Sequence, residues 1–472
     1  MAFFKFNLAK ANASLKSLFL ISSLLSSTGM ANGIDGEWKA TVQVTDKEWL
    51  PVIVHIDEKN GEWSGEIDSP AQQKYGVEIS RLQVSENTIS FAVEELNIAY
   101  KGVYNPIVDL MFGSNTQDES YPLNFRKVID STPENRPQTP TVPFPYTVED
   151  IRFKNKTTNH ILAGTLTKPK STIKATAVLI SGSGPQDRDE TAFGHKAFAV
   201  IADHLTRQGY AVFRYDERGI GESTGDFFAA TTKDFAQDTN AVVEYLNSRS
   251  DLPLGKVGLI GHSEGGMIAP MVASSRDDIA FTILLGGPTV KIQELLVDQW
   301  HKDRIHNGTK VQTSQKISQL DKLVFQQLAA LSEGQSITEE IHQLLYKSVE
   351  LEGLKDDKLE AQVEQLKRQY STPWFRYAVR FNPEHYLKET KSPLLALNGS
   401  LDFQVDAKMN LNNLERILSS TDHTDYKVIE LEKMNHLFQV AEKGSFAEYA
   451  ELEESFSPIA LNLMTDWLNE RF

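Results

Sequence analysis

Hydrophobic and polar residues alternate in short segments along the first part of the chain. The clearest alternating segments are residues 38–44, 51–56, 62–67 and 88–93. A period of two is typical of strands with one buried face, and no helical period interrupts it in this part of the chain. Asn60 and Gly61 both tolerate the positive φ of a tight hairpin turn. We therefore expect residues 33–128 to form a small antiparallel β domain, either a barrel or a sandwich.

Prolines mark the end of this first domain. Five of them lie between Asp130 and Tyr146, at positions 133, 137, 140, 143 and 145. Prolines at this density favour an extended polyproline conformation over a helix or a strand. The sequence therefore predicts a linker over residues 129–146.

Beyond the linker the pattern changes, and short continuous apolar runs occur at residues 175–180, 211–215 and 281–285. The predicted strands are residues 148–153, 161–167, 175–180, 211–215, 256–260, 281–285, 394–398 and 426–431, and helical periods cover residues 196–208, 234–247 and 458–472. Continuous hydrophobicity is typical of strands that are covered on both faces. Because strands and helices alternate, residues 147–472 are predicted to form an α/β domain with a mainly parallel sheet and helices on both faces.

The strand pattern stops between about residue 290 and residue 391. The helices expected in this stretch are residues 292–305, 311–331, 337–349 and 359–370. The stretch lies between two predicted strands of the sheet, so we expect a helical cap over the carboxyl ends of the strands. An aromatic group at residues 374–377 either packs the cap or forms a wall of the site.

One short motif carries the strongest chemical signal. Gly261-His262-Ser263-Glu264-Gly265-Gly266 lies between the apolar run 256–260 and a segment of small and apolar residues. A G-x-S-x-G motif between a strand and a helix is typical of a nucleophile elbow, whose strained turn exposes the serine hydroxyl. The alternative is a structural turn in an inactive relative. We interpret Ser263 as the nucleophile.

A serine nucleophile needs a base, and that base needs a carboxylate to orient it. Asp402 and His436 each follow the end of a predicted strand, in the chain order Ser, Asp, His of this architecture. Both should therefore lie at the same edge of the sheet as Ser263. The competing residues are Asp406 for the acid, and His385 and His423 for the base.

The oxyanion of an acyl-transfer intermediate requires two backbone N–H groups. One should belong to Glu264, the residue after the nucleophile, and the other to the glycine-rich loop at residues 181–189. Within that loop, Ser183 or Gly184 is the expected donor. Glycine-rich loops also bind phosphates, but no lysine follows this one in the pattern of a phosphate-binding loop.

Composition narrows the function further. The net charge of −16 argues against nucleic acid as the main partner, because phosphate binding requires a basic surface. The chain has no cysteine, which excludes a cysteine nucleophile, a lipid-modified cysteine anchor and thiolate metal sites. The expected chemistry requires no metal and no organic cofactor.

The first 31 residues have the pattern of a signal peptide. Lys5, Lys10 and Lys16 precede an apolar run at residues 18–25, and Gly29-Met30-Ala31 offers small residues for cleavage after Ala31. The run is too short for a stable membrane anchor. We expect an exported protein, periplasmic or secreted; the alternative is a disordered or amphipathic N-terminal tail.

From about residue 147 onward the chain resembles the alpha/beta-hydrolase superfamily. Residues 215–223, Tyr-Asp-Glu-Arg-Gly-Ile-Gly-Glu-Ser, resemble its D-x-R-G-x-G-x-S turn. The 181–189 loop, the elbow and residues 435–439 are similar to bacterial secreted esterases that are grouped with serine aminopeptidase-like hydrolases, some of which carry a small β domain first. The chain departs from many members at Ser181, where they have histidine.

The signal-peptide pattern and the site residues together predict an exported serine hydrolase that works through an acyl-enzyme, and the resemblance implies that its substrates are small carboxylic esters. An exopeptidase with the same triad would need a carboxylate in the cap to receive the free amino terminus of a peptide, and the cap contains many acidic residues. A thioesterase is a third possibility. A protein without catalysis, in which the β domain binds a ligand, is the alternative from a different class.

Overall fold

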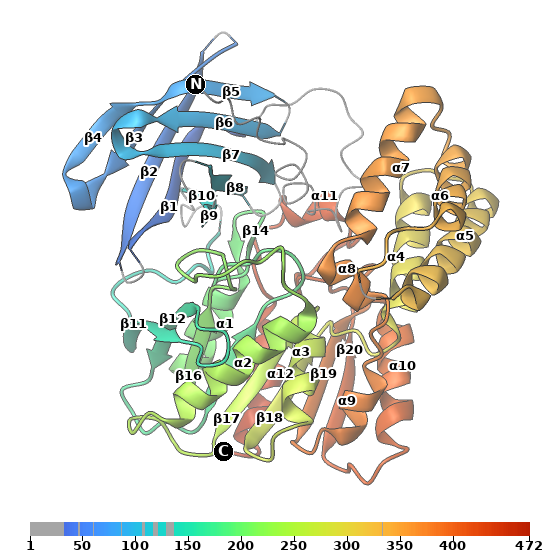
Figure 1. The fold of residues 1–472 in the computed structure, drawn as a ribbon. Coiled ribbons are helices and arrows are strands. Elements are labelled where there is room, and N and C mark those ends of the chain that lie inside the picture. The colour runs from blue at the N-terminus through green and yellow to red at the C-terminus, as the bar shows by residue number, and fades with distance from the viewer. Residues whose placement is uncertain are drawn as a thin grey trace.

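The computed structural model describes residues 33–45, 48–59, 61–85, 87–105, 109–116, 121–128, 136–332 and 334–472. The predicted signal peptide and Asn60 of the hairpin signal lie outside the described residues. Figure 1 shows a β part in blue, a layered α/β part in green and red, and a group of helices in yellow and orange beside them.

The first part of the chain is a ten-stranded sheet in which the neighbouring strands are antiparallel. The strands are β1 (Gly36–Thr45), β2 (Glu48–Lys59), β3 (Glu62–Ser69), β4 (Lys74–Glu78), β5 (Ser80–Ser85), β6 (Thr88–Val93), β7 (Ile98–Asn105), β8 (Leu110–Asn115), β9 (Tyr121–Pro122) and β10 (Phe125–Lys127). Two short 3-10 helices, Pro70–Gln72 and Glu94–Leu96, interrupt them.

This sheet curls on itself. Its strand order is β4-β3-β2-β1-β10-β8-β7-β6-β5, with β9 beside β8, so the two end strands are consecutive in the chain. The Ile79 N–H donates to the Gly65 carbonyl at 2.9 Å and draws these ends together. Trp38, Tyr100 and Phe125 are fully buried inside, which is the ordinary core role of aromatic side chains. The prediction of an N-terminal all-β part is confirmed.

The second sheet has eight strands in the order β11-β12-β16-β13-β17-β18-β19-β20. The strands are β11 (Thr147–Lys154), β12 (Ile161–Lys168), β13 (Thr176–Ile180), β16 (Ala211–Tyr215), β17 (Val257–His262), β18 (Ile279–Leu285), β19 (Leu394–Gly399) and β20 (Tyr426–Leu431). From β16 to β20 the neighbours are parallel, whereas β11 and β12 run antiparallel at one edge. A small hairpin of β14 (Thr191–Ala192) and β15 (His195–Lys196) follows the loop after β13.

Helices cover both faces of this sheet (Figure 1). They are α1 (Ala197–Arg207), α2 (Thr232–Asn247), α3 (Gly265–Ala273), α10 (Ala407–Leu418) and α12 (Pro458–Asn469), whereas the short helix α11 (Phe446–Tyr449) lies above the sheet. In β13, Val178 and Ile180 belong to the core that includes α2, α3 and α10, whereas Leu179 belongs to the core with α1 and α12. β13 is therefore buried on both sides, as its continuous apolar run predicts.

The cap lies between β18 and β19. It consists of α4 (Ile292–His306), α5 (Val311–Ala330), α6 (Glu339–Leu351), α7 (Asp356–Tyr370), α8 (Pro373–Ala378) and α9 (Glu384–Glu389). The rings of Phe325, Tyr370 and Phe375 pack together inside it, with centroids 4.4 to 5.9 Å apart. The predicted helical insertion is confirmed. The domain limits at residues 33, 128, 146 and 147 stay predictions.

None of the helices in the described ranges is both long enough and apolar enough to serve as a membrane-spanning segment.

Candidate active site

Ser263 occupies a sharp turn between a strand and a helix. β17 ends at His262 and α3 begins at Gly265, and Ser263 between them has φ +51°, a left-handed conformation that is uncommon outside glycine. A Cβ atom on Gly265 would lie 2.1 Å from the Ile180 carbonyl oxygen, so only glycine fits there. The turn therefore has the geometry that the motif predicts for a nucleophile elbow.

Asp402 and His436 are in direct contact. The His436 Nδ1 atom lies 2.7 Å from Asp402 Oδ2, and both side chains are buried. The other carboxylate oxygen of Asp402 accepts the backbone N–H groups of Gln404 and Val405, at 2.9 and 2.8 Å. Since Nδ1 donates to the carboxylate, Nε2 of the neutral ring is the nitrogen that can accept a proton.

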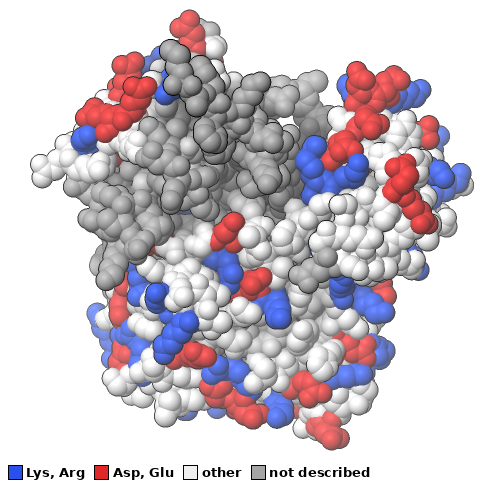
Figure 2. Space-filling model, viewed as in Figure 1, with Lys and Arg blue, Asp and Glu red and all other residues white. Residues whose placement is uncertain are grey.

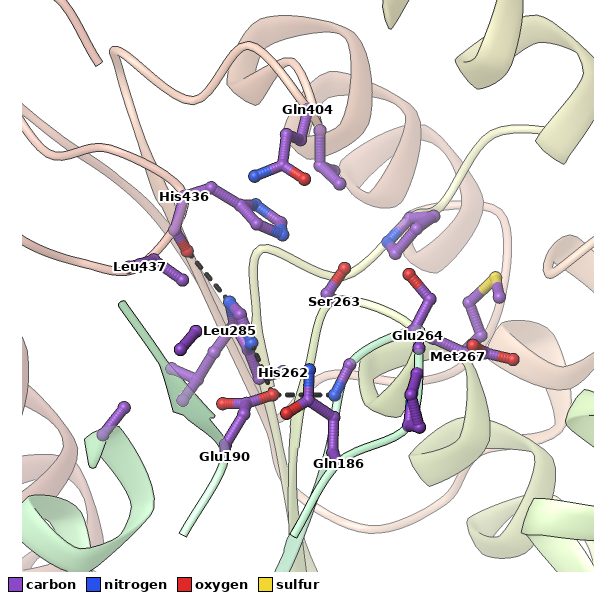
Figure 3. A pocket seen from close by; sticks show the side chains of 18 of the residues that line it. Gln186, Glu190, His262, Ser263, Glu264, Met267, Leu285, Gln404, His436 and Leu437 are labelled. Carbon is purple, nitrogen blue, oxygen red and sulfur yellow. Dashed lines mark hydrogen bonds and ion pairs between the residues drawn. The ribbon is translucent and has the colours of Figure 1, made fainter. Parts of the chain in front are cut away.

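Ser263 and His436 line one pocket. Figure 3 shows the Ser263 hydroxyl and the His436 ring both directed into this pocket, from opposite sides. In the described part of the chain no hydrogen bond joins the two side chains. Such bonds are often long in a free enzyme and tighten when substrate binds.

The competing residues lie elsewhere. Asp406 caps α10 by accepting the Met409 N–H at 2.7 Å, and it pairs with Lys302 at 2.6 Å. His423 contacts the Ser392 carbonyl oxygen, at the edge where β19 begins, and His385 lies in α9. None of the three competing residues is among the described residues that line the pocket with Ser263.

The loop after β13 brings backbone amides to the same pocket. Gly182 donates its N–H to the Glu190 carboxylate at 2.7 Å and is therefore occupied. Ser183 and Gly184 line the pocket, and within the described ranges their N–H groups, like that of Glu264, have no acceptor. These amides are free to bind an oxyanion.

A second buried network lies behind Ser263, and the sequence did not reveal it. His262 Nδ1 lies 2.9 Å from Glu190, and His262 Nε2 lies 2.9 Å from the His436 carbonyl oxygen (Figure 3). Burial disfavours the charged ring, but the Glu190 carboxylate outweighs this effect, and the pKa of His262 is raised. The sequence showed only that His262 precedes Ser263 in the motif.

Glu264 connects the elbow to the cap. Its carboxylate accepts the Thr232 hydroxyl at 2.6 Å and the indole N–H of Trp374, in α8 of the cap, at 2.8 Å. Burial raises the pKa of Glu264, and the two hydrogen bonds oppose this rise. The aromatic group of the cap thus reaches the residue that follows Ser263.

The pocket is large and mainly apolar. Its volume is about 1890 Å³, the space open to solvent included. Phe193, Phe198, Phe228, Leu295, Leu296 and Trp374 contribute apolar surface to it. The carboxylates among its described lining residues are Glu190 and Glu264, and each already accepts two hydrogen bonds from the protein. Among the described residues, no group of three or more His, Asp or Glu side chains is arranged to hold a metal ion.

This fold and this site define the chain as an alpha/beta hydrolase. A family model described as serine aminopeptidase, S33, matches residues 195–439, more than half of the sequence. The chain belongs to this family.

Two kinds of relatives are similar to the chain. Esterase EstD of Thermotoga maritima is 33% identical over 152 residues, which is 32% of this chain and 36% of EstD, so the match spans about a third of that relative. The structure of esterase Pf2001 of Pyrococcus furiosus is 16% identical and covers 73% of this chain and 96% of its own, with a TM-score of 0.43. Est1E of Butyrivibrio proteoclasticus, solved with ferulic acid, is 15% identical over 68% of this chain and 96% of its own, with a TM-score of 0.39.

Proposed function

We propose that the protein is a serine hydrolase that cleaves carboxylic esters through an acyl-enzyme. The observation that carries the proposal is the 2.7 Å bond between Asp402 and His436, in the pocket that Ser263 enters from a nucleophile elbow. An imidazole that is oriented by a carboxylate, in one pocket with a serine hydroxyl, is the arrangement that acyl transfer requires.

Each residue has one role in the proposed reaction. Ser263 attacks the ester carbonyl while His436 takes its proton, and Asp402 stabilises the imidazolium that forms. The Glu264 amide and a second amide from Ser183 or Gly184 bind the negative oxygen of the tetrahedral intermediate. His436 then protonates the leaving alcohol. In the second half-reaction His436 takes a proton from water, which attacks the acyl-enzyme; the bond to Ser263 breaks, the acid leaves, and His436 returns the proton to the Ser263 oxygen. No step needs a metal or an organic cofactor.

The pocket favours an ester over a peptide with a free amino terminus. An exopeptidase needs a carboxylate that can bind the substrate ammonium group. Glu190 and Glu264 are the carboxylates among the described lining residues; both are buried, and each already accepts two hydrogen bonds from the protein at its Oε1 atom. The apolar walls suit an uncharged acyl or aryl group. The similarity to EstD, an esterase, also supports this choice.

Small uncharged esters are the proposed partners, rather than nucleic acid. On the face drawn in Figure 2, acidic and basic side chains are interspersed over the α/β part, and the whole chain has a net charge of −16. A nucleic-acid partner would require a concentrated basic surface.

A labelling experiment and a substrate panel test the proposal. A fluorophosphonate probe should label the purified protein, and Ser263→Ala should abolish the labelling, whereas Ser274→Ala, a serine in the turn after α3, should not. A panel of p-nitrophenyl esters, thioesters and aminoacyl anilides then identifies the bond, and we expect esters to react fastest. Turnover of the anilides alone would overturn the ester assignment. A protein that does not react with the probe would be a binding protein.

We also propose export, with residues 1–31 as a signal peptide, 33–128 as a β domain, 129–146 as a linker and 147–472 as the hydrolase domain. The lysines before a short apolar run support the first assignment. Mass spectrometry of the protein from the periplasm or the medium should find a chain that begins at Asn32. An intact N-terminus in the cytoplasm would overturn export.

A further inference from the structure

The β part packs against the hydrolase part beside the pocket. Leu110 and Phe112 of β8 form an apolar cluster with Ile220, from the turn after β16. The ring of Phe112 also meets the ring of Phe228 edge to face, with centroids 5.8 Å apart. Because Phe228 lines the pocket, a wall of the proposed site rests on the β part.

Polar contacts reinforce this surface. The Asn124 side-chain amide donates to the Gly219 carbonyl oxygen, in the same turn after β16. Asn105, the last residue of β7, lines the pocket itself. The chain that follows β10 is also tied to the hydrolase part, since Gln138 donates to the Phe456 carbonyl oxygen at 2.7 Å. These contacts fix the position of the β part next to the site.

One ion pair reaches the loop that supplies the proposed oxyanion donors. Arg126 of β10 places Nη1 3.1 Å from Asp187 Oδ2, and the side chains are only 22% and 12% exposed. Asp187 follows Ser183 and Gly184 in the loop at residues 181–189. The ion pair is therefore a direct link between the β part and the oxyanion loop.

Asp187 holds the far end of that loop. Its Oδ1 atom accepts the Thr191 N–H at 2.9 Å and the Asp189 N–H at 3.2 Å, and its Oδ2 atom accepts the Thr191 hydroxyl at 2.9 Å. Burial raises the pKa of Asp187, and the positive charge of Arg126 opposes this rise. Without Arg126 the ionised form of a buried carboxylate would lose a compensating charge.

The other anchors of the loop come from the hydrolase part. Gly182 donates to Glu190, the Gln186 N–H donates to Glu217 at 2.9 Å, and the Arg188 N–H donates to Asp216 at 2.8 Å. Arg126 differs from these anchors because it comes from the preceding sheet. The loop is thus held between two parts of the chain.

We propose that Arg126 is a positioning residue for ester hydrolysis, and that the β part thereby completes the oxyanion site. The inference rests on the proposed function. Arg126 touches no substrate; it acts through Asp187, which sets the path of the loop and so the direction of the Ser183 and Gly184 amides. Oxyanion donors act on the transition state, so a shifted loop lowers kcat and leaves KM nearly unchanged.

The test compares charge-removing variants at both ends of the pair. Arg126→Met keeps an apolar stem and removes the charge, and Asp187→Asn keeps an acceptor for Thr191 and removes the opposite charge. Arg126→Met should lower kcat about 10- to 100-fold, the loss that a small misplacement of catalytic groups causes. In the Asp187→Asn background the same change should cost much less, because the charges act as a pair.

A matched control lies on the same sheet. Arg81 of β5 pairs with Glu94 at 3.2 Å, and both side chains are largely exposed. Arg81→Met should leave kcat at the wild-type value. Active-site titration with the fluorophosphonate probe gives the folded, competent fraction of every variant, so that kcat refers to competent sites.

The possible results distinguish a failure of the proposed ester hydrolysis from a failure of the proposed role of Arg126. A wild-type protein that neither reacts with the probe nor cleaves esters would overturn the proposed function. An active wild type with an unchanged kcat per competent site in Arg126→Met would overturn the role of Arg126, even if fewer molecules fold. Equal losses from Arg126→Met in both backgrounds would show that Arg126 does not act through Asp187. A lower kcat with constant KM and a coupled double variant supports the inference.

Discussion

The Nε2 atom of His262 lies 2.9 Å from the backbone carbonyl oxygen of His436, so the residue before the proposed nucleophile is bonded to the loop of the proposed base. Its Nδ1 atom lies 2.9 Å from the Glu190 carboxylate. A carbonyl and an ionised carboxylate are acceptors only, whereas a neutral imidazole has one N–H to donate. The imidazolium form of His262 satisfies both contacts.

We therefore expect His262 to carry a positive charge at neutral pH. Burial lowers the pKa of His262, but Glu190, with smaller help from the His436 carbonyl and Asp402, reverses this effect, and the pKa is raised overall. A raised folded-state pKa gives a contribution to the free energy of unfolding that is complete below the unfolded value of about 6.5. That contribution is lost as the pH rises through the folded value. The unfolding temperature should therefore fall as the pH is raised from neutral to alkaline values.

The matched variant for this prediction is His262→Gln, which can keep one of the two hydrogen bonds and cannot titrate. Its unfolding temperature should be lower at neutral pH and should lack the alkaline decline that is due to residue 262. The ring of His436 lies close to that of His262, with the centroids 4.8 Å apart. Histidine NMR spectra of both proteins are therefore needed to show which of the two rings changes its protonation. An unchanged alkaline decline in the variant would contradict a charged His262.

We predict opposite effects on kcat when Asp402 and Asp406 are each replaced by asparagine. Asp402→Asn keeps an acceptor for the Val405 N–H but removes the charge that holds the His436 ring, so kcat should fall about 10⁴-fold. Asp406→Asn keeps the cap of α10, loses the ion pair with Lys302 and should retain kcat. Steady-state kinetics of both variants on a p-nitrophenyl ester show which of the two carboxylates supports catalysis. If the large loss occurs in Asp406→Asn instead, the assigned acid is wrong.

The sequence could predict the strands that carry the site because their signals are local. Apolar runs identified β17 and β19, and a more mixed segment identified β20. Ser263 directly follows β17, and Asp402 and His436 lie a few residues beyond the ends of β19 and β20. The partners in the buried networks have no local signal. His262 and Glu190 are 72 residues apart, and Glu264 and Trp374 are 110 apart, so only the folded chain brings them together.

Parts of the first sheet were missed for a different reason. β4 and β5 are the end strands of the sheet. β5 does alternate polar and apolar residues, but both strands are short and neither buries a side chain fully, so their signals are weak. β7 does alternate buried and more exposed positions, but its apolar positions include tyrosine and glycine and give a weaker pattern. A shared surface such as the one between Phe112 and Phe228 depends on the packing of two sheets, which no single segment specifies.

The hydrogen bond between Trp374 and Glu264 should affect stability and rate together. Trp374→Phe keeps an aromatic ring in the pocket wall but removes the indole donor, which leaves Glu264 with Thr232 alone. Loss of a hydrogen bond to a buried carboxylate should lower the free energy of unfolding by about 1–2 kcal/mol. Because the Glu264 amide is a proposed oxyanion donor, kcat/KM should also fall. Chemical denaturation and steady-state kinetics measure the two effects.

Trp300→Phe is the control in the same cap. Trp300 packs against Phe325 and Tyr370, does not line the described pocket and has no bond to the elbow. Its loss of ring area should lower stability without lowering kcat/KM. Equal kinetic losses in the two variants would mean that the cap acts through its packing and not through Glu264.

Two glycine variants test whether the elbow needs its tight approach to the sheet. A Cβ atom on Gly265 would lie 2.1 Å from the Ile180 carbonyl oxygen, a backbone atom that cannot move without shifting β13, so Gly265→Ala should greatly reduce both stability and turnover. Gly308 has a positive φ of 88° but open space around the Cβ position, so Gly308→Ala should cost only the conformational strain of about 1 kcal/mol. Unfolding curves and kcat measured on both proteins check the contrast. A Gly265→Ala protein with near wild-type stability and rate would mean that the turn can relax, and the steric basis of the proposed nucleophile position would then fail.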